Sequence, residues 1–199
     1  MTGSDQGKAG QTVRAFIAFA LPEDVRSHLR RVQAELKKED WPVKWVQPDN
    51  IHLTLKFLGD VPETEIPSIR RAMEAAADGF EAIRLSASGL GAFPGVKRPR
   101  VIWCGVGGDL EALTALHERL ETELAALGKE KEGRAFKGHL TLGRVKGRVP
   151  PEALVEAVTR HGKTEFRIFS GDCLYLFQSR LKPGGPEYRE LACVRLPPA

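Results

Sequence analysis

The stretch HLTLKFLG at residues 52–59 has a near copy, HLTLGRVKG, at residues 139–147. The chain contains five histidines, and two of them open these stretches in the same His-Leu-Thr-Leu frame, 87 residues apart (52 to 139). Alternating polar and apolar residues are typical of a β-strand with one face in the core. A matched pair of such strands indicates that a larger unit of the chain is repeated.

The segments around the two stretches follow one another in the same order in both halves. Apolar periodicity predicts strand, helix, histidine strand, helix and strand, first at 12–20, 22–40, 51–59, 62–79 and 80–93, then at 100–108, 109–128, 139–145, 150–162 and 165–177. We therefore expect one repeat at about 13–93, a second at about 100–177, and a C-terminal hairpin at 172–196. Duplicated units commonly pack about a two-fold axis, which would let the two histidine strands face one cleft.

Length and composition fit a single globular domain. The chain has 199 residues, of which 42% are apolar and 28% charged. We expect residues 13–199 to form one bilobal domain and the Gly-, Ser- and Thr-rich residues 1–12 to be a disordered tail. No apolar run approaches the roughly 20 residues of a membrane span, and the opening lacks the apolar core of a signal peptide. We expect a cytoplasmic monomer without membrane contact.

The cysteines and the basic residues give two further expectations. Cys104, Cys173 and Cys193 are odd in number and form no CxxC spacing, so we expect small buried hydrophobes and neither a disulfide nor a zinc site. The net charge is +4, and basic residues cluster at 95–100, 128–138 and 143–148. Such clusters favour a polyanionic partner, with ordinary solvated loops as the alternative interpretation.

The polar residues of the two stretches form matched pairs. His52 and Thr54 share one face of their strand, and His139 and Thr141 share one face of theirs, because residues two apart point the same way. Two histidines, with ordinary pKa values of about 6.5, can act as general acid and general base on either side of a substrate. Threonine hydroxyls can donate hydrogen bonds to its non-bridging oxygens. A phosphate ester fits this set of four groups, whereas one such stretch alone would be weak evidence.

Arg144 is a fifth candidate, although strict alternation turns it away from the His139 face. A β-bulge near Gly143 is needed to bring the guanidinium to the cleft. The chain contains no carboxylate-rich cluster of the kind that holds two metal ions in phosphatases, so we expect proton transfer and hydrogen bonding to replace a metal. We predict neither a metal nor a cofactor.

In these motifs the chain resembles the 2H phosphoesterase superfamily, named for its two His-x-Thr motifs, and within it the RNA 2′,3′-cyclic phosphodiesterases once called 2′-5′ RNA ligases. The resemblance covers nearly the whole chain, through RAFIAFALP (14–22), WVQPDNIHLTLKFLGDV (45–61), RPRVIWCGV (98–106), HLTLGRV (139–145) and LYLFQSRLKPGGPEYREL (174–191). It implies an α+β fold of two lobes, with two mainly antiparallel sheets flanking a central cleft and helices packed outside. One departure is Gly138, where similar proteins are expected to carry proline.

The resemblance also assigns roles. It implies hydrolysis of RNA 2′,3′-cyclic phosphate ends to 2′-phosphates without a metal. His52 would donate a proton to the departing 3′ oxygen, and His139 would accept a proton from the attacking water. Thr54 and Thr141 would hold phosphate oxygens, and Arg144 would offset charge on the phosphoryl group. The symmetry of the two stretches alone does not decide which histidine is the acid.

The expected partners are RNA ends, tRNA among them, or cyclic nucleotides. Two alternatives stay open: a phosphodiesterase for 2′-5′-linked or small cyclic nucleotides, and a non-catalytic nucleotide- or RNA-binding module. The complete set of two histidines and two threonines counts against the module, because binding alone needs no acid and base. We expect a basic rim at Lys97, Arg98, Arg100 and Lys137. The aromatic residue that stacks on a base is left open among Phe57, Phe93, Trp103 and Phe136.

Overall fold

The structure is a computed structural model that describes residues 11–161, 167–183 and 185–198. Most of the tail expected at residues 1–12 lies outside the described residues, but Thr12 already begins the first strand. In the described part of the chain, none of the helices is both long and apolar enough to span a bilayer.

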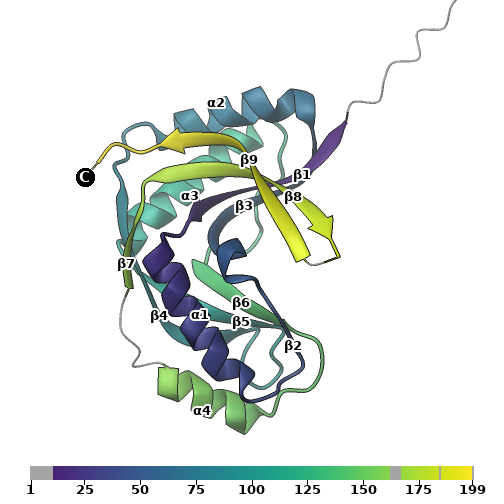
Figure 1. Cartoon of the computed structure of the whole chain (residues 1–199). Coiled ribbons are helices and arrows are strands. Elements are labelled where there is room, and N and C mark those ends of the chain that lie inside the picture. The colour runs from purple at the N-terminus through teal and green to yellow at the C-terminus, as the bar shows by residue number, and fades with distance from the viewer. Residues whose placement is uncertain (1–10, 162–166, 184, 199) are drawn as a thin grey trace, which may run out of the picture.

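The strands form one curled antiparallel sheet in the order β7-β4-β5-β6-β3-β1-β8-β9, with β2 beside β6 (Figure 1). We call β3, β1, β8 and β9 the first arm of the sheet, and β7, β4, β5 and β6 with β2 the second arm. The bounds are β1 Thr12–Ala20, β2 Val43–Trp45, β3 His52–Pro62, β4 Ile83–Phe93, β5 Val101–Gly108, β6 His139–Val145, β7 Arg167–Gly171, β8 Cys173–Lys182 and β9 Gly185–Arg195.

The two arms are joined at a single residue pair, Leu53 of β3 opposite Leu140 of β6. The α+β class and the antiparallel pairing are confirmed. The two sheets expected from the resemblance are the two arms of this continuous sheet, and the histidine strands lie next to each other where the arms meet.

Two helices, α1 (Glu23–Lys37) and α3 (Leu110–Ala125), cross over between the arms, whereas α2 (Ile66–Ala77) and α4 (Pro151–His161) stay on the arm of the strand they follow. Helix α1 follows β1 of the first arm but contacts β7 of the second, and α3 follows β5 of the second arm but contacts β3 of the first. Helix α4 contacts β4, and α2 contacts β9 (Figure 1). Each arm is thus covered by helices from both halves of the sequence.

Local sequence explains the helix bounds. The residues of α1 at apolar spacings of three and four are all buried, as the periodicity predicted. Pro22 precedes the first turn, where its missing N–H costs no hydrogen bond. The predicted cap of α3 is confirmed, because a side-chain oxygen of Asp109 accepts a hydrogen bond from the backbone N–H of Ala112 at 3.0 Å.

A β-bulge follows the threonine in each histidine stretch. Leu55 is the extra residue of β3 opposite β1, and Leu142 is the extra residue of β6 opposite β5. A bulge reverses the alternation of side chains beyond it, so Phe57 and Arg144 return to the histidine face. The bulge expected near Gly143 is therefore present, and a second one, which alternation did not predict, matches it in the first stretch.

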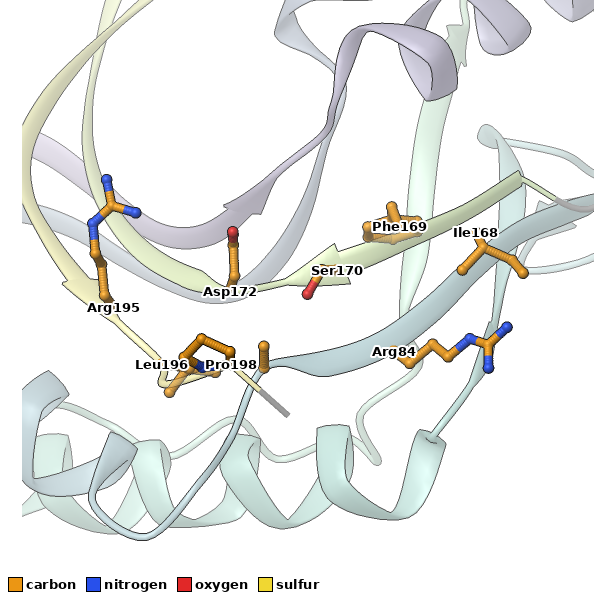
Figure 2. Close-up of a pocket in the computed structure, with 9 residues that line it drawn as sticks. Arg84, Ile168, Phe169, Ser170, Asp172, Arg195, Leu196 and Pro198 are labelled. Carbon is orange, nitrogen blue, oxygen red and sulfur yellow. The ribbon is translucent and has the colours of Figure 1, made fainter.

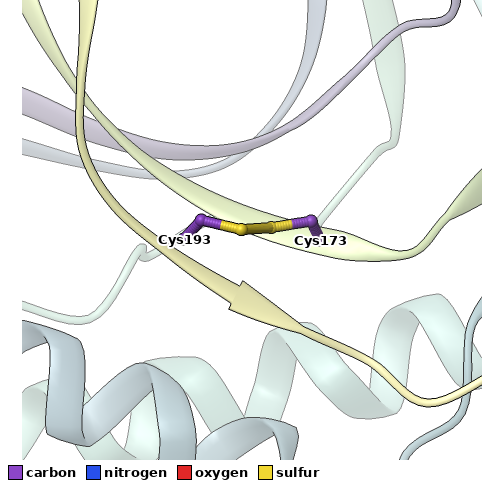
Figure 3. Close-up of a disulfide and its surroundings, with 2 residues drawn as sticks. All are labelled: Cys173 and Cys193. Atoms are coloured by element: carbon purple, nitrogen blue, oxygen red, sulfur yellow. A yellow bond between two sulfur atoms is a disulfide. The ribbon is translucent and has the colours of Figure 1, made fainter.

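Cys173 of β8 and Cys193 of β9 form a disulfide, with their Cα atoms 6.2 Å apart (Figure 3). The expectation that no cysteine is bridged is therefore wrong for these two. They lie diagonally across the ladder, because Cys173 is opposite Arg195 and Cys193 is opposite Tyr175. An odd cysteine count does not exclude one such pair. Cys104 is buried as predicted, and its burial raises the pKa of the thiol to about 12.

Candidate active site

The two histidine stretches meet at the joint between the arms. Leu53 and Leu140, the residues after the two histidines, lie opposite each other and are fully buried. In an antiparallel pair this register sets each histidine beside the threonine of the other strand. The structure therefore brings together both histidines and both threonines named from the sequence.

Both imidazoles are held in the same way by backbone carbonyls. Nδ1 of His52 is 2.9 Å from the carbonyl oxygen of Asn50, and Nδ1 of His139 is 2.7 Å from that of Lys137. A carbonyl can only accept, so the proton of each neutral ring is on Nδ1 and the lone pair is on Nε2. Each neutral histidine thus offers Nε2 as a proton acceptor, and each protonated one offers Nε2–H as a donor.

Aromatic rings enclose His52. The ring of Phe16 stacks on it with centroids 4.6 Å apart, and Tyr188 of β9 meets it edge-on at 5.2 Å. Burial lowers the pKa of His52 to about 4, an effect to which the positive charges of His139 and Arg144 add and which the Asn50 carbonyl opposes. The free protein therefore holds His52 in its neutral form at pH 7.

His139 has a different aromatic neighbour. The ring of Phe93 meets it edge-on, with ring centroids 5.0 Å apart, and the ring centroids of Phe93 and Trp103 are also 5.0 Å apart. By sequence spacing Trp103 of β5 corresponds to Phe16 of β1, 87 residues earlier (16 to 103). The register differs, however, because Trp103 is opposite Thr141 and Phe16 is opposite Phe57. Gly91 leaves room for Trp103, since an added Cβ there would lie 2.3 Å from the indole. The two halves thus surround their histidines with aromatic rings that come from different positions in the strand register.

Arg144 is close enough to the site to act on its charges. Its guanidinium lowers the pKa of His52, and it opposes the burial that raises the pKa of Tyr188. The five residues named from the sequence are therefore gathered at one place. Sequence reasoning missed Tyr188 and Phe16 as neighbours of His52, although both belong to the stretches that carry the family resemblance.

A cavity of about 930 Å³ runs from Thr54 and His139 toward α3. Its lining includes the ion pair of Lys56 and Glu121 and one further carboxylate, Glu132. It also includes three basic and three aromatic side chains: Arg100, Arg134, Lys137, Phe57, Phe93 and Phe136. Of the predicted basic rim, Arg100 and Lys137 line this cavity, whereas Lys97 and Arg98 do not. Arg134 joins them without having been singled out in the sequence. The ring of Phe57 is 60% exposed, which leaves its face free for a ligand.

A separate pocket of about 660 Å³ is lined by residues of β4, β7 and the C-terminal segment (Figure 2). Its two guanidinium groups, Arg84 and Arg195, extend away from each other (Figure 2), and Asp172 lies between the strands that carry them. It contains none of the residues named from the sequence. The charges do not converge as they do around the histidines.

The comparisons with known proteins agree with the motifs. The model of the family described as LigT like Phosphoesterase matches residues 19–103 and 108–188. The RNA 2′,3′-cyclic phosphodiesterase of Methanothermobacter thermautotrophicus is 37% identical over 184 residues, which are 92% of this chain and 99% of that protein. That of Aeropyrum pernix is 36% identical over 167 residues, covering 84% of this chain and 94% of that one.

Solved structures show the same fold. The protein TT0787 of Thermus thermophilus aligns with a TM-score of 0.74 at 29% identity, over 93% of this chain and 98% of that one. Escherichia coli LigT complexed with 3′-AMP aligns with a TM-score of 0.70 at 24% identity, over 94% of this chain and 99% of that one. The family model and the relatives cover most of the sequence, and the chain therefore belongs to the LigT-like phosphoesterase family.

Proposed function

We propose that this protein hydrolyses 2′,3′-cyclic phosphate ends of RNA to 2′-phosphates. The observation that carries the proposal is the pair of imidazoles on adjacent strands, each hydrogen-bonded through Nδ1 and each with Nε2 available for proton transfer. The curated relatives named RNA 2′,3′-cyclic phosphodiesterase support the choice of substrate.

In the proposed reaction, Nε2 of His139 takes a proton from water while the water oxygen forms a bond to phosphorus. The bond from phosphorus to the 3′ oxygen breaks, and protonated His52 gives its Nε2 proton to that oxygen, which leaves the phosphate on the 2′ oxygen. Thr54 and Thr141 donate hydrogen bonds to the non-bridging oxygens, and Arg144 offsets the charge that develops on them. Proton exchange with solvent then restores both histidines.

The low pKa of His52 shapes this mechanism. With a pKa of about 4, His52 is neutral in the free enzyme and gains its proton when the phosphate anion binds beside it, because a nearby negative charge raises the pKa of an imidazole. An acid is active only when protonated, so activity falls as pH rises through its pKa. His52 is therefore expected to titrate at higher pH in the substrate complex, which kcat reports, than in the free enzyme, which kcat/KM reports.

Charge and aromatic surface in the cavity support RNA over a mononucleotide as the substrate. Arg100, Arg134 and Lys137 can meet phosphates upstream of the cyclic end, and Phe57 can stack on a base. Affinity for an oligonucleotide should then fall as salt rises, and more steeply than affinity for a cyclic mononucleotide. Equal salt dependence of the two would favour the small cyclic nucleotide as substrate.

The decisive experiment is incubation with a 2′,3′-cyclic mononucleotide and with an RNA of the same 3′ end, both in excess EDTA. We expect formation of the 2′-phosphate, with the double variant His52→Ala and His139→Ala as the inactive control. Binding without turnover would instead identify a nucleotide-binding module. Within the described ranges, no three His, Cys, Asp or Glu side chains lie close enough together to hold a metal ion, and the proposed steps use the residues alone.

The assembly and location belong to the same proposal. Both histidine stretches lie in one chain and meet at Leu53 and Leu140, so we expect an active monomer, which sedimentation at assay concentration tests. RNA as the proposed substrate supports the cytoplasm. Disulfides are rare there outside hyperthermophiles, so counting the free thiols of Cys173 and Cys193 in freshly isolated protein tests that location.

A further inference from the structure

Two buried polar side chains occupy nearly matching places on the first helix of each predicted repeat. Gln33 lies on α1 and Glu121 on α3, 88 positions apart (33 to 121). They are 1% and 7% exposed. Burying a polar or charged group is costly unless it is hydrogen-bonded, so the partners of these two side chains show what they hold in place.

Gln33 joins the approach to the first histidine to the strand of the second. Its Nε2 donates hydrogen bonds of 2.8 Å to the carbonyl oxygen of Val46 and of 2.8 Å to that of Leu142. Val46 lies in the segment that leads to His52, and Leu142 is the bulged residue of β6. The N–H of Val46 also donates to the carbonyl of Leu142 at 2.9 Å, so this amide reinforces the end of the β2–β6 pairing, where the approach to His52 leaves the strand of His139.

Glu121 makes the converse connection through Lys56. Nζ of Lys56 lies 2.8 Å from Oε1 and 2.9 Å from Oε2 of Glu121, and it also donates a 2.6 Å hydrogen bond to the carbonyl oxygen of Glu130. The backbone N–H of Glu132 donates to Oε2 of Glu121 at 3.0 Å. Lys56 belongs to β3, the first histidine strand, whereas Glu130 and Glu132 lie in segment 129–138, which leads to the second histidine.

The far end of segment 129–138 is fixed as well. The ring of Phe136 stacks on His117 of α3 with centroids 4.2 Å apart, and burial lowers the pKa of His117, an effect that the nearby Glu121 carboxylate opposes. The next residue, Lys137, supplies the carbonyl that accepts from Nδ1 of His139. The segment is therefore held at both ends before it reaches the atom that sets the tautomer of His139.

We infer that Gln33 and the Lys56–Glu121 pair are reciprocal anchors between the two repeats, positioning residues that hold the two imidazoles in register. Each anchor sits on the helix of one repeat and joins the segment before its own histidine to the strand of the other. The consequence for turnover rests on the proposed function, whereas the consequence for the tautomers does not. The ionic anchor also fixes the wall of the cavity, which Arg134 and Lys137 line.

The sharpest test replaces the ionic anchor by the double variant Lys56→Met and Glu121→Met. Apolar replacement of both partners of a buried ion pair is often neutral for stability, so this variant is expected to fold and to melt near the wild-type temperature. Segment 129–138 loses its bonds at Glu130 and Glu132. We expect kcat/KM for RNA ending in a 2′,3′-cyclic phosphate to fall at least about tenfold, because small misplacements of catalytic groups are costly.

A second measurement tests the anchors independently of enzymatic activity. Side-chain ¹⁵N NMR at a pH where both rings are neutral reports which nitrogen of each histidine carries the proton. Wild type is expected to show Nδ1–H at both His52 and His139. The double methionine variant should lose this preference at His139 and keep it at His52, and Gln33→Met should do the reverse.

Two controls separate positioning from simple stability. Glu118→Gln removes an exposed carboxylate from the same helix and should change neither kcat/KM nor the tautomers. The reversal Lys56→Glu with Glu121→Lys restores an ion pair, but it should not restore activity, because a carboxylate at position 56 would face the carbonyl of Glu130. Full rescue by the reversal, or wild-type kcat/KM and His139 tautomer in the double methionine variant, would overturn the anchors. An inactive wild type would overturn the proposed function alone, since the tautomers still test the anchors.

Discussion

The two histidine stretches share a frame, a bulge and a backbone acceptor for Nδ1, yet their surroundings differ. His52 lies between Phe16 and Tyr188, and its burial moves its pKa to about 4. His139 meets Phe93 edge-on. Tyr188 comes from β9, which lies outside both predicted repeats. The C-terminal hairpin therefore gives two similar histidines different environments, and His52 can act as the acid only once the bound phosphate anion raises its pKa.

A second difference lies two residues beyond each bulge. Phe57 in β3 and Arg144 in β6 occupy corresponding positions, 87 residues apart (57 to 144), and both return to the histidine face. One position offers an exposed aromatic ring and the other a guanidinium. The duplicated frame thus supplies a surface for a base on one side and a charge for the phosphate on the other.

Removing either imidazole should have the largest effect. His52→Ala and His139→Ala are each expected to lower kcat about 10²- to 10⁴-fold, because each removes one proton-transfer partner. The double variant should be little worse than the singles, since the two groups act as a unit. Initial rates on a 2′,3′-cyclic nucleotide, with melting curves as the folding control, check this. Full activity in either single variant would contradict the assigned pair.

The burial of His52 should appear as a loss of folding stability when the pH is lowered. The folded pKa of His52, about 4, is below its ordinary value of 6.5, so the unfolded chain binds the proton first as pH falls. Titration of His52 therefore leaves the free energy of unfolding unchanged above pH 6.5 and lowers it between pH 6.5 and 4, by up to about 3 kcal/mol. Urea unfolding of wild type and of His52→Gln across this pH range isolates the contribution of His52 to the loss of stability.

Two variants of Tyr188 test whether this residue causes the low pKa of His52. Tyr188→Ala opens the His52 ring to water and should flatten the loss of stability in acid, whereas Tyr188→Phe keeps the ring covered and should not. The same acid slope in the alanine variant as in wild type would show that burial by the hairpin does not set the pKa of His52.

Exchanging the groups beyond the bulges should separate catalysis from binding. Arg144→Met is expected to lower kcat by about 10- to 100-fold, because it removes charge stabilisation of the phosphoryl group. Phe57→Leu should raise KM for RNA about fivefold or more and leave kcat unchanged, as loss of a stacking surface predicts. Steady-state kinetics on an oligonucleotide measure both. A change of kcat in Phe57→Leu would show that the ring positions the reacting phosphate.

The smallest effect is expected at Gly138, which corresponds to Ile51 in the first stretch. A Cβ there would meet Leu113 at 3.4 Å and Leu53 at 3.6 Å, which are ordinary contacts. Gly138→Ala should stabilise the fold by about 0.4–1 kcal/mol by restricting the unfolded chain, with kcat within about twofold of wild type. Thermal unfolding checks the gain. A destabilised variant would show that the approach to His139 needs glycine.

Local pattern predicts much of this fold, because alternation and helical spacing depend on near neighbours in the sequence. It identified both histidine strands, the helix cap at Asp109 and the need for a bulge near Gly143. Strict alternation of side chains also predicts its own exception. It turns Arg144 away from the cleft, so Arg144 reaches the cleft only if a β-bulge adds one residue to the strand.

The contacts that escaped prediction depend on register between distant segments. Cys173 and Cys193 pair because β8 and β9 align them diagonally, and Tyr188 reaches His52 because β9 carries it there. Lys56 finds Glu121 only because α3 crosses to the opposite arm. Each of these partners is set by strand register or by the packing of a helix against a strand, which composition and spacing do not encode.

The joint at Leu53 and Leu140 has a consequence for how this scaffold can change. One backbone pair, rather than a long ladder, connects the arms, and both of its side chains are fully buried on the face opposite the imidazoles. We therefore expect substitutions at these two leucines to change how the arms meet while the hydrogen-bonded ladders within each arm stay intact.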